Sequence, residues 1–160
     1  MRTIKTAIAL GIVCLSLILT GGSATAVAAK FQSSSSSVNN SGALVVSWDE
    51  RGVGNGNIDY SLTADATALY ACLNGGGKNP SAANKQSFEG SVSAAGSFES
   101  KNGRVQATLV SGPLAAPSFT CPNGQRRVLA AVSYTNIWLT DLTNGTAVHV
   151  ADASRVFYNV

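Results

Sequence analysis

Thr67-Ala-Leu-Tyr-Ala-Cys72 is a short apolar run that ends in a cysteine, and Ser118-Phe-Thr-Cys121 repeats this arrangement further along the chain. These are the only two cysteines outside the N-terminal export segment described below. In an oxidising compartment two such thiols usually pair. The bridge closes a loop of about 50 residues and stabilises the fold by about 4 kcal/mol in the chain-entropy model. We therefore expect a disulfide between Cys72 and Cys121; a single catalytic thiol is the alternative.

The N-terminus has the pattern of a secretory signal peptide. Arg2 and Lys5 precede an uncharged apolar run, and small residues follow it. A basic start, an apolar stretch and a small-residue cleavage site define this class of segment. The apolar run is short for a membrane span, which needs about 20 residues. We expect residues 1–29 to be a signal peptide cleaved after Ala28 or Ala29, with secretion and no membrane span in the mature chain; an uncleaved anchor is the alternative.

The composition of the mature chain bounds its class. Removal of Arg2 and Lys5 lowers the basic residues from 11 to 9 against 8 acidic ones, which leaves a net charge near +1. No basic patch with interleaved aromatic residues appears, since Arg126-Arg127 is only a pair. The composition therefore argues against nucleic-acid binding. The length predicts a single domain.

The mature chain begins with a segment of low complexity. Residues 30–42 are rich in Ser and Asn and contain an unbroken run from Ser33 to Ser37. This composition is typical of flexible segments. We expect a flexible lead-in over residues 30–42 and a folded domain over residues 43–160.

Short apolar runs separated by turn residues indicate an all-β domain. Apolar and polar residues alternate from Ile58 to Thr63, which is the pattern of a half-buried strand. Strands are expected over residues 43–48, 58–62, 67–73, 86–92, 95–101, 127–134, 135–142, 146–150 and 154–160, with a hairpin partner after residue 103. About ten short strands with frequent turns predict one antiparallel β-sandwich, Ig-like or jelly-roll-like, whose strand order stays open.

Two Asn-Gly pairs mark hairpin turns. Both positions of a type I′ turn need positive φ, so Asn102-Gly103 predicts a two-residue turn in which Lys101 pairs with Arg104. The same logic at Asn144-Gly145 pairs Thr140 with His149.

The second hairpin supplies the candidate site. Its register places Trp138, Thr140 and His149 on the face away from the core. Without a bulge in the strand, Asn136 and Tyr134 extend this face. A tryptophan ring stacks on a sugar, and neighbouring hydroxyl, amide and imidazole groups bind its hydroxyls. We therefore predict a ligand-binding surface there; the alternative is that Trp138 fills a second apolar layer under a loop.

Residue patterns for catalysis or metal binding are absent from the sequence. His149 is the only histidine and no G-x-S-x-G elbow accompanies it, so a Ser-His-Asp triad is not indicated. Zinc needs three or four ligands, which one histidine and a paired disulfide do not provide. The eight acidic residues show no spacing that selects a catalytic pair. The Gly-rich loop 49–59 offers oxygens for calcium, but a plain turn is preferred. We expect no catalytic residue, metal or cofactor.

The chain resembles a group of small secreted bacterial β-sandwich proteins to which no activity is attached. The similarity runs from Ala43 to about Gly145. Its segments are Ser47-Trp48, Arg51-Gly-Val-Gly54, Ile58-Asp-Tyr60, Ala68-Leu-Tyr-Ala-Cys72, Asn74-Gly-Gly-Gly77, Phe119-Thr-Cys-Pro-Asn-Gly124 and Val132-Ser-Tyr-Thr135. The resemblance implies secretion and a disulfide, and nothing about mechanism.

These observations lead to a secreted, non-catalytic binding or cell-surface module for an extracellular glycan or protein ligand. One alternative is a small extracellular hydrolase that uses a carboxylate pair. Another is a protease inhibitor that presents the proline-bounded loop Ser111–Pro117. The sequence does not set the identity of the ligand, the oligomeric state or the exposure of Trp138.

Overall fold

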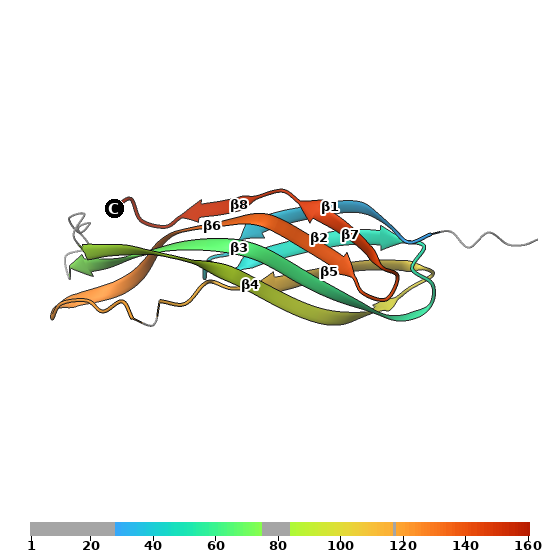
Figure 1. Ribbon diagram of the computed structural model, residues 1–160, viewed down its shortest axis with the longest axis horizontal. Helices are drawn as coiled ribbons and strands as arrows, with labels where there is room; N and C mark the ends of the chain where they lie inside the picture. Colours follow the sequence, from blue (N-terminus) through green and yellow to red (C-terminus); the bar gives the residue numbers. More distant parts are fainter. Residues whose placement is uncertain (1–27, 75–83, 117) are drawn as a thin grey trace, which may run out of the picture.

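Eight β-strands joined by turns and loops make up the chain (Figure 1). The structure is a computed structural model that describes residues 28–74, 84–116 and 118–160. In chain order the strands are β1 (Lys30–Val38), β2 (Leu44–Arg51), β3 (Gly56–Asn74), β4 (Lys85–Ser100), β5 (Arg104–Ser111), β6 (Gln125–Asp141), β7 (Thr146–Val150) and β8 (Ala153–Val156). Within the described residues there is no helix that could span a membrane. The expected signal peptide lies, up to residue 27, outside the described residues.

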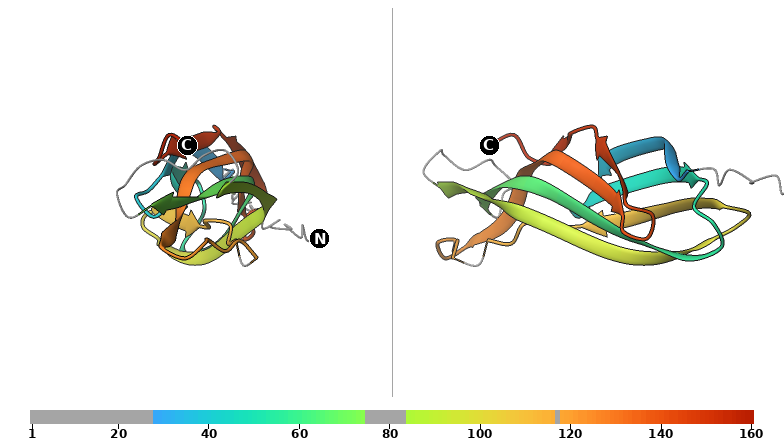
Figure 2. Two further views of the ribbon diagram at one scale, coloured as in Figure 1. Left: turned by 90° about the vertical axis from the view of Figure 1, so that its left-hand side faces the viewer. Right: turned by 45° about the vertical axis from the view of Figure 1, so that its right-hand side comes forward.

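The strands form two antiparallel sheets, as the all-β prediction requires. The smaller sheet has the order β1-β2-β5, and the larger has the order β4-β3-β6-β7 with β8 also pairing with β6. The end-on view shows strands of both sheets around a common interior (Figure 2). Along the long axis, β3, β4 and β6 continue beyond the smaller sheet (Figure 1).

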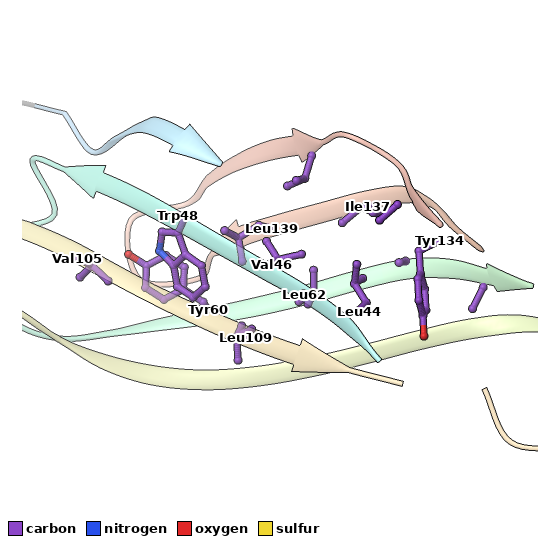
Figure 3. Close-up of a cluster of buried hydrophobic side chains, with 14 of the residues drawn as sticks. Leu44, Val46, Trp48, Tyr60, Leu62, Val105, Leu109, Tyr134, Ile137 and Leu139 are labelled. Carbon is purple, nitrogen blue, oxygen red and sulfur yellow. The ribbon is translucent and has the colours of Figure 1, made fainter. Parts of the chain in front are cut away.

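Alternate residues of facing strands fill the space between the sheets. In β2 the side chains of Leu44, Val46 and Trp48 are buried, and in β3 Tyr60 and Leu62 are buried. This alternation arises because successive side chains of a strand point to opposite faces. The rings of Trp48 and Tyr60 come from different sheets, and their centroids lie 4.7 Å apart. Figure 3 shows these side chains together in the core.

Several expected strands are fused into longer ones. The expected strands 58–62 and 67–73 belong to β3, and 86–92 and 95–101 fall largely within β4. The two pair without a break from Gly56 to Ala71 of β3. Small residues such as Ala and Ser keep the alternation of the strand while giving a weak apolar signal. The number of strands is therefore lower than predicted, and several are longer.

The flexible lead-in predicted for residues 30–42 is wrong over Lys30–Val38, which form β1. This strand pairs along its length with β2. A sheet is held by backbone hydrogen bonds, so a serine run is accepted where a neighbouring strand is present. Phe31 and Val38 also pack against the main core, and Ser36 Oγ donates a hydrogen bond to the carbonyl of Ala151.

The turn at Asn102-Gly103 is confirmed. Lys101 pairs with Arg104, and φ is 52° at Asn102 and 71° at Gly103. The pairing ends there, because β4 continues along β3 in the larger sheet whereas β5 joins β2 in the smaller one. The hairpin therefore connects the two sheets.

The disulfide between Cys72 and Cys121 is confirmed, with the Cα atoms 5.6 Å apart. It lies where β3 and β6 extend past the smaller sheet. There the chain after β5 crosses the sheet face, and Tyr70 donates its hydroxyl to the carbonyl of Leu114 at 2.8 Å. Arg127 donates to the carbonyl of Phe119 at 2.9 Å. The bridge therefore anchors a segment that covers the exposed end of the larger sheet.

Candidate functional site

Trp138 lies on the outer face of the larger sheet, in β6. Its side chain is 42% exposed, whereas Trp48 in the core is 4% exposed. His149 of β7 is its direct cross-strand partner. The centroids of the two rings are 5.1 Å apart, with an interplanar angle of 70°. The edge-to-face contact restrains the indole while leaving part of its surface open to solvent.

A hydrogen-bond chain fixes the orientation of the indole. The Nε1–H of Trp138 donates to Oδ1 of Asn136 at 3.0 Å. Asn136 in turn donates from Nδ2 to Oδ2 of Asp65 in β3 at 3.2 Å. Asn136 has a φ of 50°, a left-handed conformation that asparagine tolerates better than most residues. We call the surface formed by Trp138, His149, Asn136 and Asp65 the Trp138 surface.

Tyr134 was predicted on this face, and the structure places it in the core. Between Thr135 and Trp138, β6 advances three residues while β3 advances two. This bulge reverses the face on which the preceding residues lie. The Tyr134 side chain is fully buried, and its hydroxyl donates to the carbonyl of Gly42 at 2.6 Å. Burial raises the pKa of this hydroxyl above its ordinary value.

The register of the second hairpin also differs from the prediction, by two residues. His149 pairs with Trp138 rather than with Thr140. The turn has four residues, 142–145, and the buried carboxylate of Asp141 accepts two backbone N–H groups within it. A shift of two residues keeps every side chain on its own face. The prediction that Trp138 and His149 share the non-core face is therefore confirmed, as direct rather than diagonal neighbours.

The chemistry available at the Trp138 surface is stacking combined with hydroxyl recognition. The indole N–H is already engaged, so the free part of Trp138 is its apolar ring surface. Thr63, the partner of Trp138 on β3, is exposed, and Thr140 is half-buried on the same face. The carboxylate of Asp65 is a further acceptor, which sequence reasoning missed because only the sheet register brings β3 beside Asn136. An aromatic plane beside several polar groups suits a sugar ring.

Two carboxylates do lie together, but inside the fold. Glu50 and Asp141 are both fully buried. Oε2 of Glu50 accepts a hydrogen bond from the Tyr60 hydroxyl, and Oε1 accepts one from Thr146 Oγ1, each at 2.8 Å. Burial raises the pKa of Glu50, the two hydrogen bonds oppose this effect, and the charge of Asp141 adds to it. With these internal donors in place, the pair faces the protein interior rather than a substrate.

Other expected site features can be located as well. Cys72 and Cys121 are joined in the disulfide, so neither provides a thiolate. In the part of the chain that the structure describes, no three His, Cys, Asp or Glu side chains gather in a group that could hold a metal ion. The carboxylate that opens the Gly-rich loop, Asp49, is bound by Arg104.

The loop considered for protease inhibition does not project as an inhibitor loop would. Ser111 and Ala116 are buried, and the carbonyl of Leu114 accepts the hydrogen bond from Tyr70. Pro117 lies outside the described residues. The segment is held against the larger sheet instead of being presented to solvent along its length.

Comparisons with protein-family models, with curated proteins and with solved structures found no match to this chain. A functional conclusion therefore has to come from the geometry of the described residues.

Proposed function

We propose that this chain is a secreted, non-catalytic β-sandwich protein that binds an extracellular glycan through the Trp138 surface. The observation that carries this proposal is the 42% exposure of Trp138 on an ordered strand whose neighbours restrain the ring. An exposed aromatic side chain held by a rigid scaffold loses little conformational entropy when a ligand binds.

The neighbours of Trp138 favour a sugar over an apolar protein ligand. Asn136, Asp65 and His149 surround the ring with amide, carboxylate and imidazole groups. Sugars combine apolar faces with hydroxyl groups, so they can stack on the ring and bond to its polar neighbours. A protein interface is expected to be apolar at its centre and polar at its rim.

Secretion is supported by two features. The N-terminal sequence has the order of a signal peptide, and Cys72 and Cys121 form a disulfide. Disulfides persist in oxidising compartments and are rare in the cytosol. The bridge also secures the sheet extension, so the fold is suited to an extracellular setting.

A pull-down with insoluble polysaccharides tests the proposal. Purified protein is mixed with cellulose, chitin and peptidoglycan, and the bound fraction is measured for wild type and Trp138→Ala. Val110→Ala is the matched control, because Val110 is an apolar side chain 51% exposed on the smaller sheet. Retention of wild type and Val110→Ala, with loss of Trp138→Ala, supports the proposal. Equal retention of all three proteins, or of none, counts against it.

A further inference from the structure

Four basic residues from three strands and one turn form a line at one end of the molecule. Lys30 is the partner of Arg51, Arg51 is the partner of Arg104, and Arg104 is the partner of Lys101. Residues directly opposite each other in a sheet lie on the same face, with Cβ atoms about 5 Å apart. We call these four residues the cation row. It runs across the start of β1, the end of β2, the start of β5 and the turn after β4, all at one end of Figure 1.

The positive charge of the cation row is only partly compensated. Arg104 donates from Nε and Nη2 to the two carboxylate oxygens of Asp49, at 2.8 and 2.6 Å. Arg51 reaches the same carboxylate only at 3.9 Å, and its side chain is 58% exposed. Lys30 and Lys101 are also exposed. Like charges on directly opposed residues destabilise a sheet, so this arrangement carries a cost that an external anion would relieve.

Two adjoining hollows flank the cation row. The first has a volume of about 470 Å³ and is lined by Arg51, Gly52, Asn102, Gly103 and Arg104. The second has a volume of about 570 Å³ and shares Asn102 and Arg104 with the first. Its remaining lining residues are Glu99, Lys101 and Gln106. The first hollow therefore has guanidinium groups and no carboxylate among its lining residues, and the second places one carboxylate opposite two cations.

We propose that the cation row binds an anionic polysaccharide through its carboxylate or sulfate groups. A line of cations spread over adjacent strands matches a polymer with repeated negative charges better than a single small anion. The residues that line the two hollows include no aromatic side chain on which a nucleic-acid base would stack. The cation row lies on the smaller sheet and its connecting turn, so the site is distinct from the Trp138 surface on the larger sheet.

Binding to defined polymers tests the inference. The probes are dextran sulfate, polygalacturonate and uncharged dextran, with single-stranded DNA as a competitor, measured by calorimetry at about 20 and about 300 mM NaCl. Binding of at least one anionic polysaccharide at low salt, weakened at high salt, is expected because ion pairs are screened. The two anionic probes distinguish sulfate from carboxylate recognition. Absence of binding to both, equal binding of uncharged dextran, or tighter binding of the DNA overturns the inference.

Charge-matched variants separate a site from general attraction. Arg51→Gln/Lys101→Gln removes two charges from the cation row, and Lys85→Gln/Arg126→Gln removes two from the starts of β4 and β6. The first variant should weaken binding by about tenfold or more, and the second should change it by less than about twofold. An equal loss in both variants would reduce the effect to net charge and overturn the inference.

A third variant distinguishes this site from the proposed glycan site. Trp138→Ala should leave the binding of the anionic polysaccharide unchanged even where it abolishes retention on neutral polysaccharides. Loss of anionic binding in Trp138→Ala would move the ligand to the Trp138 surface and overturn the inference. Circular dichroism of each variant verifies that the fold is retained, since all substituted side chains lie on the surface.

Discussion

Glu50 of β2 and Tyr60 of β3 join the two sheets through a buried hydrogen bond of 2.8 Å between the tyrosine hydroxyl and the carboxylate. Both side chains are fully buried. Burial and this hydrogen bond raise the pKa of the Tyr60 hydroxyl, and burial raises that of Glu50. A polar contact therefore sits in the middle of an aromatic cluster, where its protonation affects the stability of the fold.

The first prediction concerns Glu50 and pH. Its pKa in the folded protein is raised above the ordinary value of 4.5, so the folded state binds the proton more tightly than the unfolded chain. Stability from this group is fully present below the unfolded pKa and is lost as pH rises through the folded pKa. Glu50→Gln should flatten this decline, so its free energy of unfolding should gain on wild type from acidic to neutral pH. Urea denaturation across this range measures the difference, with exposed Glu99→Gln as the control; parallel curves for Glu50→Gln and wild type would contradict the assignment.

The second prediction concerns Asp49 and Arg104 and has the opposite sign. The hydrogen bonds from Arg104 hold the pKa of Asp49 below its ordinary value of 3.8. A lowered pKa contributes stability above the unfolded value, and this stability is lost as pH falls through the folded pKa. Arg104→Gln should raise the pKa of Asp49 toward its ordinary value. An NMR titration of the Asp49 carboxyl carbon measures this change, and Lys85→Gln should leave it unaltered. An Asp49 titration that does not respond to Arg104→Gln would rule out this pairing in solution.

The third prediction concerns the disulfide. The cysteines are separated by 49 positions, which corresponds to about 4 kcal/mol in the chain-entropy model. Cys72→Ala/Cys121→Ala should lower the free energy of unfolding by about this amount, and reduction of wild type should have a similar effect. Denaturation with and without reductant measures both. Peptide mapping of unreduced protein should yield one cross-linked pair, and free thiols at both positions in secreted protein would remove the bridge from the account.

The fourth prediction compares the two tryptophans. Trp138→Ala should cost only about 1 kcal/mol, because the ring is partly exposed and its main packing partner is His149. Trp48→Ala should cost about 3–5 kcal/mol, because it leaves a cavity in the core. Thermal melts of both variants give the comparison. A large drop for Trp138→Ala would show that its ring is part of a packed layer and would defeat the glycan-binding proposal.

The fifth prediction concerns processing. The small residues before Lys30 predict that the mature chain begins at Ala29 or Lys30. The intact mass of protein recovered from the medium measures this directly. A mass that includes residues 1–28 would instead favour a membrane anchor.

Features that depend on local chemistry were readable from the sequence. The alternation around Ile58 and Tyr60 predicted the buried face of β3, because the period of two is a property of a single strand. Asn102-Gly103 predicted its turn, because positive φ is a preference of those two residues. Cys72 and Cys121 predicted their bridge because no other cysteine follows the export segment.

Features that depend on neighbouring strands were decided only by the tertiary structure. The serine run of β1 is a strand because β2 lies beside it, and no side-chain pattern encodes that partner. One extra residue in β6 sends Tyr134 into the core while Trp138 stays outside, and a bulge is set by pairing with β3. The cation row likewise joins residues that are distant in the sequence. Register between strands is a non-local property, whereas propensity and periodicity are local, so the sequence alone predicted strands and turns but not the surfaces they create.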